Sequence, residues 1–158
     1  MHPHQQLLET FYRAFSKKDF QTMAACYHPE ASFRDEVFYL KGKEIGAMWH
    51  MLCVRGKDLE LTFSDVHAED KTGSAHWEAW YSFSQTGKKV HNVIEARFTF
   101  REGKIFKHVD SFSFYRWARQ AFGMPGILLG WTPYLRSKVQ AGALAGLRKF
   151  IQAYPEYA

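Results

Sequence analysis

Two residues that could carry acid–base chemistry stand close together in an aromatic stretch, KHVDSFSFYRW (107–117). These are His108 and Asp110. Side chains alternate along a strand, so one face of this stretch collects the polar pair and the rings, namely Phe106, His108, Asp110, Phe112 and Phe114. We expect that face to point inward. A carboxylate and an imidazole in an apolar interior can serve as general acid or base, or can satisfy each other as a structural polar group.

A second carboxylate of interest is Asp35, in ASFRDEVF (31–38). At the mouth of a pocket, an aspartate could move a proton on the carbon next to a carbonyl group. The alternative is a solvated residue in a cluster of Arg, Asp and Glu. The sequence leaves both interpretations open.

The helices and strands that position these residues are indicated by the spacing of apolar residues, which changes along the chain from a helical period to alternation. Apolar residues recur at helical spacing over 4–17, then after Asp19, which could cap a helix, and again after KGKE (41–44). Residues 31–40 are expected to be extended. Alternating segments follow, separated by short turns with Gly, at 59–69, 74–84, 90–100 and 105–117. Helices followed by an antiparallel meander predict an α+β fold.

The C-terminal part has a different pattern. Residues 118–133 are interrupted by Gly and Pro, and an amphipathic helix is predicted after them. Gly142 and Gly146 within it favour close packing on another element. We therefore expect a domain over 1–122 and a helical extension over 123–158, packed on the same domain or on a dimer partner.

Composition narrows the classes of function. The 158 residues include 14 Phe and 5 Trp, which need a packed interior. The net charge of +5 comes from scattered Lys and Arg, so nucleic-acid binding is not expected. The two cysteines form no CxxC motif, which fits a reduced, cytoplasmic protein. No apolar run is long enough to span a membrane, and no metal or nucleotide motif occurs, so we expect no membrane partner, metal or cofactor.

Residues 5–117 resemble the nuclear transport factor 2-like superfamily, which includes SnoaL-like proteins, ketosteroid isomerases and limonene epoxide hydrolase. The resemblance is carried by FYRAFSKKDF (11–20), YHPEASFRDEVF (27–38) and FTFREGKIFKHVDSF (98–112). The stretch FYRWARQAFGMPGILLGWTP (114–133) also resembles the C-terminal part of a bacterial subgroup. The resemblance implies a cystatin-like α+β barrel, in which a cone-shaped, curved antiparallel sheet wraps around the N-terminal helices and encloses a pocket.

The same resemblance implies roles for the two aspartates. Asp110 matches the acid/base aspartate in the last strand of SnoaL-like cyclases and limonene epoxide hydrolase, and Asp35 matches the general base of ketosteroid isomerases. The chain departs from both enzymes. Phe11, beside Tyr12, stands where the isomerases have an oxyanion-stabilising Tyr, and Ala96 stands where they have a protonated Asp. His76-Trp77-Glu78 replaces the Arg-x-Asp of the epoxide hydrolase.

We expect aromatic side chains to wall the pocket, namely Tyr12, Tyr27, Trp49, Trp77, Tyr81 and Phe112. Glu95 and Arg97 should lie on the outer surface of the sheet as part of an ion pair. One hypothesis is a cofactor-free enzyme, of cyclase, isomerase or hydrolase type, acting on a small hydrophobic carbonyl compound. The other is a non-catalytic module that binds a hydrophobic ligand or dimerises. A homodimer is expected in either case.

Overall fold

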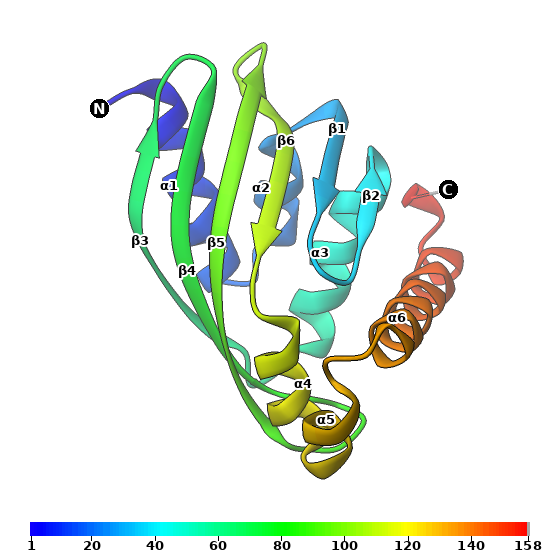
Figure 1. Ribbon diagram of the computed structural model, residues 1–158. Coiled ribbons are helices and arrows are strands. Elements are labelled where there is room, and N and C mark those ends of the chain that lie inside the picture. The colour runs from blue at the N-terminus through cyan, green and yellow to red at the C-terminus, as the bar shows by residue number, and fades with distance from the viewer. Residues whose placement is uncertain (158) are drawn as a thin grey trace.

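The computed structural model describes residues 1–157, which form a curved, unclosed sheet backed by helices (Figure 1). Within these residues the sheet has six strands in the order β2-β1-β6-β5-β4-β3. The strands are β1 (Tyr27–Arg34), β2 (Tyr39–Lys41), β3 (Glu60–Ala68), β4 (Thr72–Ser82), β5 (Lys89–Arg101) and β6 (Lys104–Ser111). The helices are α1 (Pro3–Ser16), α2 (Phe20–Ala25), α3 (Lys43–Arg55), α4 (Phe114–Phe122), α5 (Met124–Leu129) and α6 (Pro133–Ala153), followed by a 3-10 turn, η1 (Pro155–Tyr157). The α+β class is confirmed.

The predicted meander is the larger part of the sheet. Strands β3, β4, β5 and β6 pair antiparallel in chain order. Strand β1 joins the edge of β6 in parallel, and β2 folds back antiparallel on β1. The first strand begins at Tyr27, four residues before the extended stretch expected over 31–40. In Figure 1 the outer face of the sheet is toward the viewer, and α1, α2 and α3 lie behind it.

A β-bulge in β6 corrects one part of the predicted alternation. Phe100 pairs with Ile105 and Thr99 with Lys107, so Phe106 is an extra residue on β6. The extra residue places Ile105 in the core and turns Phe106 outward, where the Arg101 guanidinium lies 3.8 Å from the centre of its ring. Alternation resumes after the bulge.

The predicted last strand is also shorter than expected. It ends at Ser111, and Phe114 begins α4 instead of continuing the strand. The Ser113 side chain accepts a hydrogen bond from the Arg116 N–H, which is the usual way in which a serine caps a helix. Phe112 lies in the connection and is half-buried. The chain therefore turns from the end of β6 into a helix at the lower end of the sheet in Figure 1.

Helix α3 is buried on two sides. Ile45, Met48, Trp49 and Cys53 face the core. The opposite side is covered by α6, which buries Leu147 and Phe150 and confirms the predicted amphipathic helix. The prediction of close packing at Gly142 was wrong, because a Cβ added there would have no neighbour within 4 Å. The division at residue 122 stays a prediction. No helix in the described part of the chain is long and apolar enough to cross a membrane.

Candidate functional site

The polar pair of β6 lies inside the sheet's concave face. His108 is 1% exposed and Asp110 is 4% exposed, which confirms that both side chains point inward. The His108 Nε2 atom lies 2.8 Å from Asp110 Oδ1. Because an ionised carboxylate only accepts hydrogen bonds, the imidazole donates through Nε2.

Two further side chains extend this pair into a buried chain of hydrogen bonds. The hydroxyl of Tyr27 lies 2.7 Å from His108 Nδ1, and the indole N–H of Trp49 donates to the same hydroxyl at 3.1 Å. With Nε2 protonated, Nδ1 is an acceptor, so Tyr27 donates to it. The hydrogen bonds then run in one direction, from Trp49 through Tyr27 and His108 to Asp110. The chain fixes the tautomer of His108 and leaves Asp110 Oδ2 as the oxygen that His108 does not occupy.

Aromatic rings enclose the imidazole on several sides. The centre of the Phe98 ring lies 4.3 Å from that of His108, and the Phe33 ring lies edge-on at 4.9 Å. Phe11 is also edge-on, at 5.9 Å. Phe11 is thus a packing neighbour of the pair. These contacts make the surroundings of the pair apolar, and a hydrogen bond is electrostatically stronger there than in water.

Two buried donors near the pair have no hydrogen-bond partner within residues 1–157. They are the hydroxyl of Tyr12 and the indole N–H of Trp77. The two rings are neighbours, with centres 6.2 Å apart. Burial, and then the negative charge of Asp110, raise the pKa of Tyr12 well above its usual value. Since buried polar groups are normally paired, these two donors mark a place where a ligand oxygen could bind.

Asp35 directly follows the end of β1, which pairs in parallel with β6. Phe33 pairs with His108 and Arg34 with Val109, and the charge of Asp110 acts on the Asp35 carboxyl. Its Oδ1 accepts hydrogen bonds from the N–H groups of Val37 and Phe38, both at 2.7 Å.

Asp35 is half-buried, and its pKa is higher than that of a solvated carboxyl. Burial, and to a lesser degree the charge of Asp110, raise its pKa to about 6, against the lowering effect of those two hydrogen bonds. The two carboxyl groups therefore share one electrostatic environment, and Asp35 retains a proton more readily than an ordinary aspartate does.

Helix α4 covers this end of the interior. The indole N–H of Trp117 donates to the hydroxyl of Tyr81 at 2.8 Å. Burial raises the pKa of Tyr81 to about 12, and the charge of Asp35 adds to the effect. Phe112 packs between the main core and the cluster under α4.

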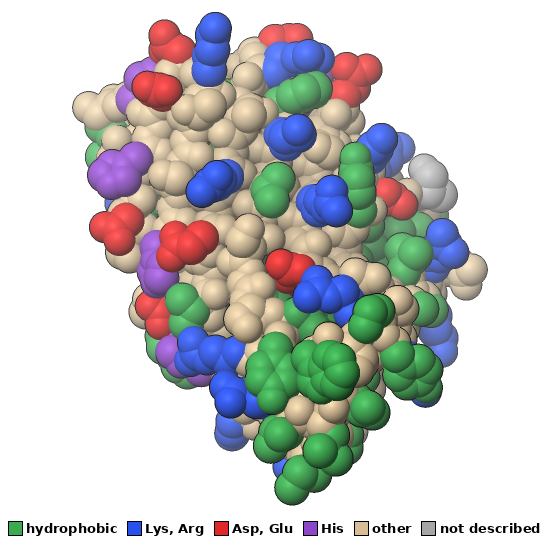
Figure 2. All heavy atoms as spheres, in the orientation of Figure 1, with side chains coloured by type: hydrophobic (Ala, Val, Ile, Leu, Met, Phe, Trp, Pro, Cys, Tyr) green, Lys and Arg blue, Asp and Glu red, His purple; other side chains and the backbone are tan. Residues whose placement is uncertain are grey.

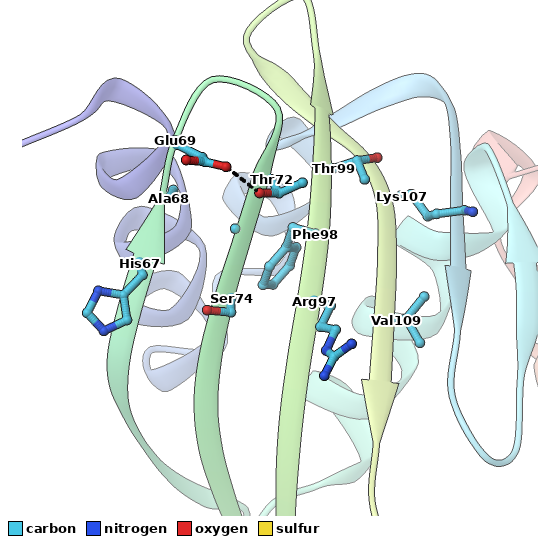
Figure 3. Close-up of a pocket in the computed structure, with 11 residues that line it drawn as sticks. His67, Ala68, Glu69, Thr72, Ser74, Arg97, Phe98, Thr99, Lys107 and Val109 are labelled. Carbon is cyan, nitrogen blue, oxygen red and sulfur yellow. Dashed lines mark hydrogen bonds between the residues drawn. The ribbon is translucent and has the colours of Figure 1, made fainter.

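The outer face of the sheet is polar and carries a separate hollow of about 480 Å³ (Figure 3). Ser74, Arg97 and Lys107 contribute to its lining. Arg97 pairs with Val109 across the strands, on the face opposite Asp110. This hollow is therefore not the site of the inward pair.

Next to it, Glu95 bonds to His76, and Glu78 bonds to both His76 (2.9 Å) and His91 (2.7 Å). The hydrogen bonds that His76 makes to Glu78 and then to Glu95 raise its pKa. Among residues 1–157 no cluster of side chains is arranged to hold a metal ion.

Comparison with known proteins agrees with this geometry. The model of the SnoaL-like domain family matches residues 8–108. The chain belongs to the SnoaL-like family. The matched region ends just before Asp110 and excludes α4, α5 and α6. No curated protein matches the chain in sequence.

Several solved structures share the fold. An epoxide hydrolase of the LEH-like type from M. tuberculosis is 17% identical, with a TM-score of 0.62 over 81% of this chain and 91% of that one. A proposed polyketide cyclase from Xanthomonas campestris pv. campestris is 18% identical, with a TM-score of 0.60 over 75% and 96%. A protein of ketosteroid isomerase-like fold from Catenulispora acidiphila, solved with trimethylamine, is 12% identical, with a TM-score of 0.65 over 80% and 97%. At these identities the likeness shows the fold alone.

The predicted site residues take different places in the structure. His108, Asp110 and Asp35 lie side by side, and Tyr12 and Trp77 present free donors to the same interior. Tyr27 and Trp49 serve the hydrogen-bond chain to His108. Sequence reasoning missed Trp117, because its segment resembled a continuing strand. The serine at 113 was the signal that could have indicated a helix start.

Proposed function

We propose that the SnoaL-like chain binds a small hydrophobic carbonyl compound inside the cone and moves a proton on it without a cofactor. The observation that carries the proposal is an inward carboxylate, Asp110, held by His108 within an apolar interior that also contains the unpartnered hydroxyl of Tyr12. A base and an oxygen-binding donor are the two groups that removal of a proton next to a carbonyl requires.

In this mechanism Asp110 takes a proton from the carbon beside the carbonyl. The C–H electron pair forms a carbon–carbon double bond, and the carbonyl π pair moves onto the oxygen. Tyr12 donates a hydrogen bond to that oxygen, and Trp77 is placed to add a second. Asp110 then returns the proton to the same or a conjugated carbon, and the carbonyl forms again. The hydrogen bond with Tyr27 holds the imidazole of His108 directed at Asp110 Oδ1.

This arrangement changes the expectation drawn from Phe11 and Ala96. The usual donors of the isomerases are replaced in sequence, yet Tyr12 supplies a buried hydroxyl from the same helix. Water-mediated epoxide opening has less support. The inward residues of the middle strand, β4, are Ala75, Trp77 and Ala79, none of which can bridge two aspartates.

The proposal is tested with 2-tetralone, an apolar ketone with acidic C–H bonds, in heavy water. Exchange of hydrogen for deuterium beside the carbonyl is followed by NMR. Wild-type chain should accelerate exchange, Asp110→Asn should lower the acceleration by about 100-fold or more, and Tyr12→Phe by about tenfold or more. Glu95→Gln, a carboxylate change on the outer face, is the matched control. Full exchange by a folded Asp110→Asn variant would refute the role of Asp110.

A second candidate function is binding without turnover. It is favoured by the complete hydrogen bonding of His108 and by the close ring contacts around it, as in a structural network. Quenching of tryptophan fluorescence by 2-tetralone, with no exchange above the solution rate, would support this candidate. The expected homodimer stays a prediction, which light scattering on the purified chain tests.

A further inference from the structure

The connection between α4 and α6 presents large apolar side chains to solvent. Of the ten large hydrophobic side chains exposed within residues 1–157, six lie in the eleven-residue stretch 124–134. We call these six the α5 patch: Met124, Ile127, Leu128, Leu129, Trp131 and Tyr134. Figure 2 shows hydrophobic side chains gathered at this lower end of the molecule. Isolated exposed hydrophobic residues are ordinary, but a contiguous group marks an interaction surface.

The local structure explains why the patch faces outward. Gly126 is the buried residue of α5, and a Cβ at that position would lie 2.0 Å from the carbonyl oxygen of Ala118 on α4. The helix therefore docks through its glycine and turns Leu128, 61% exposed, to solvent. An ordinary surface helix has the reverse arrangement, with its large apolar residues inward.

Trp131 is the most exposed residue of the patch, at 74%. Its indole N–H donates to the carbonyl oxygen of Leu128 at 3.0 Å, so its polar group is satisfied by α5 itself. The apolar ring is left uncovered. Trp and Tyr are the side chains that favour the boundary between water and lipid, and both occur in the patch.

The charged side chains described next, around the α5 patch, are all cationic. The guanidinium of Arg119 lies 5.2 Å from the ring centre of Tyr115, whose hydroxyl donates to the Ile127 carbonyl. The Lys88 side chain lies against Gly123, and the Lys138 ammonium lies 5.5 Å from the ring centre of Tyr134. None of these three cations forms an ion pair within residues 1–157.

The sequence around the α5 patch has the same excess of positive charge. Residues 111–155 contain six Lys and Arg and no Asp or Glu. Among the ion pairs within residues 1–157, only one joins this segment to a carboxylate, that of Glu36 with Arg136. An apolar surface with an unpaired cationic border matches a bilayer whose headgroups are anionic. A second copy of the chain fits less well, because a symmetric contact would place like charges against each other.

We infer that the α5 patch binds the surface of an anionic lipid bilayer, with Leu128 and Trp131 entering the interface and Arg119 and Lys138 contacting headgroups. The segment is far too short to span a bilayer, so the contact is interfacial. This departs from the expectation of no membrane partner, which rested on the absence of a spanning segment. It does not depend on the proposed acid–base chemistry.

The test is flotation of the full chain with vesicles of phosphatidylcholine alone or mixed with phosphatidylserine. The chain should float with the mixed vesicles and much less with the neutral ones. Leu128→Ser/Trp131→Ser should lower partitioning by about tenfold or more, and Arg119→Gln/Lys138→Gln by about tenfold at low salt. The matched control is Tyr39→Ser/Val54→Ser, which changes exposed apolar residues elsewhere and should leave partitioning unchanged.

Each other outcome overturns the inference. Absence of flotation with mixed vesicles refutes it, and so does an equal loss in the control variant. A patch variant that turns a dimer into a monomer, without any lipid binding by the wild type, would assign the patch to a second copy. Asp110→Asn should float like wild type, which separates failure of this inference from failure of the proposed function.

Discussion

The raised pKa of Asp35 predicts that this side chain costs stability at neutral pH. A carboxyl with a pKa of about 6 in the folded chain and 3.8 ordinarily binds its proton more tightly when folded. Its folded-state advantage is present below about pH 3.8 and is lost as the pH rises through about 6. The full difference corresponds to about 3 kcal/mol.

Asp35→Asn removes this cost while keeping the local geometry. The amide oxygen of Asn can accept the same hydrogen bonds from Val37 and Phe38, though less strongly than a carboxylate would. We therefore expect the free energy of unfolding to rise by about 2 kcal/mol at about pH 8 and to change little at about pH 3.5.

Urea unfolding of both chains across this pH range provides the measurement. The stability difference should grow between about pH 4 and pH 6 and then stay level. Glu36→Gln at the neighbouring position, which breaks a surface ion pair with Arg136, is a control without that pH profile. If Asp35→Asn gains nothing at about pH 8, or if its effect is the same at every pH, the burial argument for Asp35 is refuted.

Three further changes test the packing that positions the site. Leu147→Ala should lower the free energy of unfolding by about 2–5 kcal/mol, because Leu147 is the buried contact of α6 on α3; urea unfolding measures it, with exposed Leu128→Ala as the comparison. Gly126→Ala should destabilise the chain by forcing α5 off α4, whereas Gly142→Ala, in open space, should stabilise it by about 0.5–1 kcal/mol; equal effects in thermal melts would contradict this. Ser113→Ala should cost about 1 kcal/mol in the same melts, because it removes the cap of α4.

The inward position of His108 and Asp110 could be predicted because strand alternation is a local property. Phe106 could not be placed in the same way, since the bulge that turns it outward arises from pairing between Thr99 and Lys107 on different strands. Alternation alone gives the relative faces of residues on one side of such a bulge. It does not give the position of the bulge.

The unpartnered hydroxyl of Tyr12 and the exposure of the α5 patch lay beyond sequence reasoning for a related reason. Phe11 and Tyr12 are both fully buried on α1, and only the contacts of the folded chain show that the Tyr12 hydroxyl has no partner. The segment around Gly126 is apolar enough to be a core helix. The close approach of α4 at Gly126 decides which side is covered.

The two carboxyl groups of the site differ in their surroundings. Asp110 accepts a hydrogen bond from His108 at 2.8 Å, and in the proposed mechanism it is the base. Asp35, one strand away, is held where its own burial and the charge of Asp110 favour the protonated form, with a pKa of about 6. Two like charges on adjacent strands are costly in an apolar interior, so ionisation of one carboxyl favours a proton on the other. The register of β1 on β6 ends with Arg34 opposite Val109, so Asp35 follows directly and lies within the electrostatic reach of Asp110.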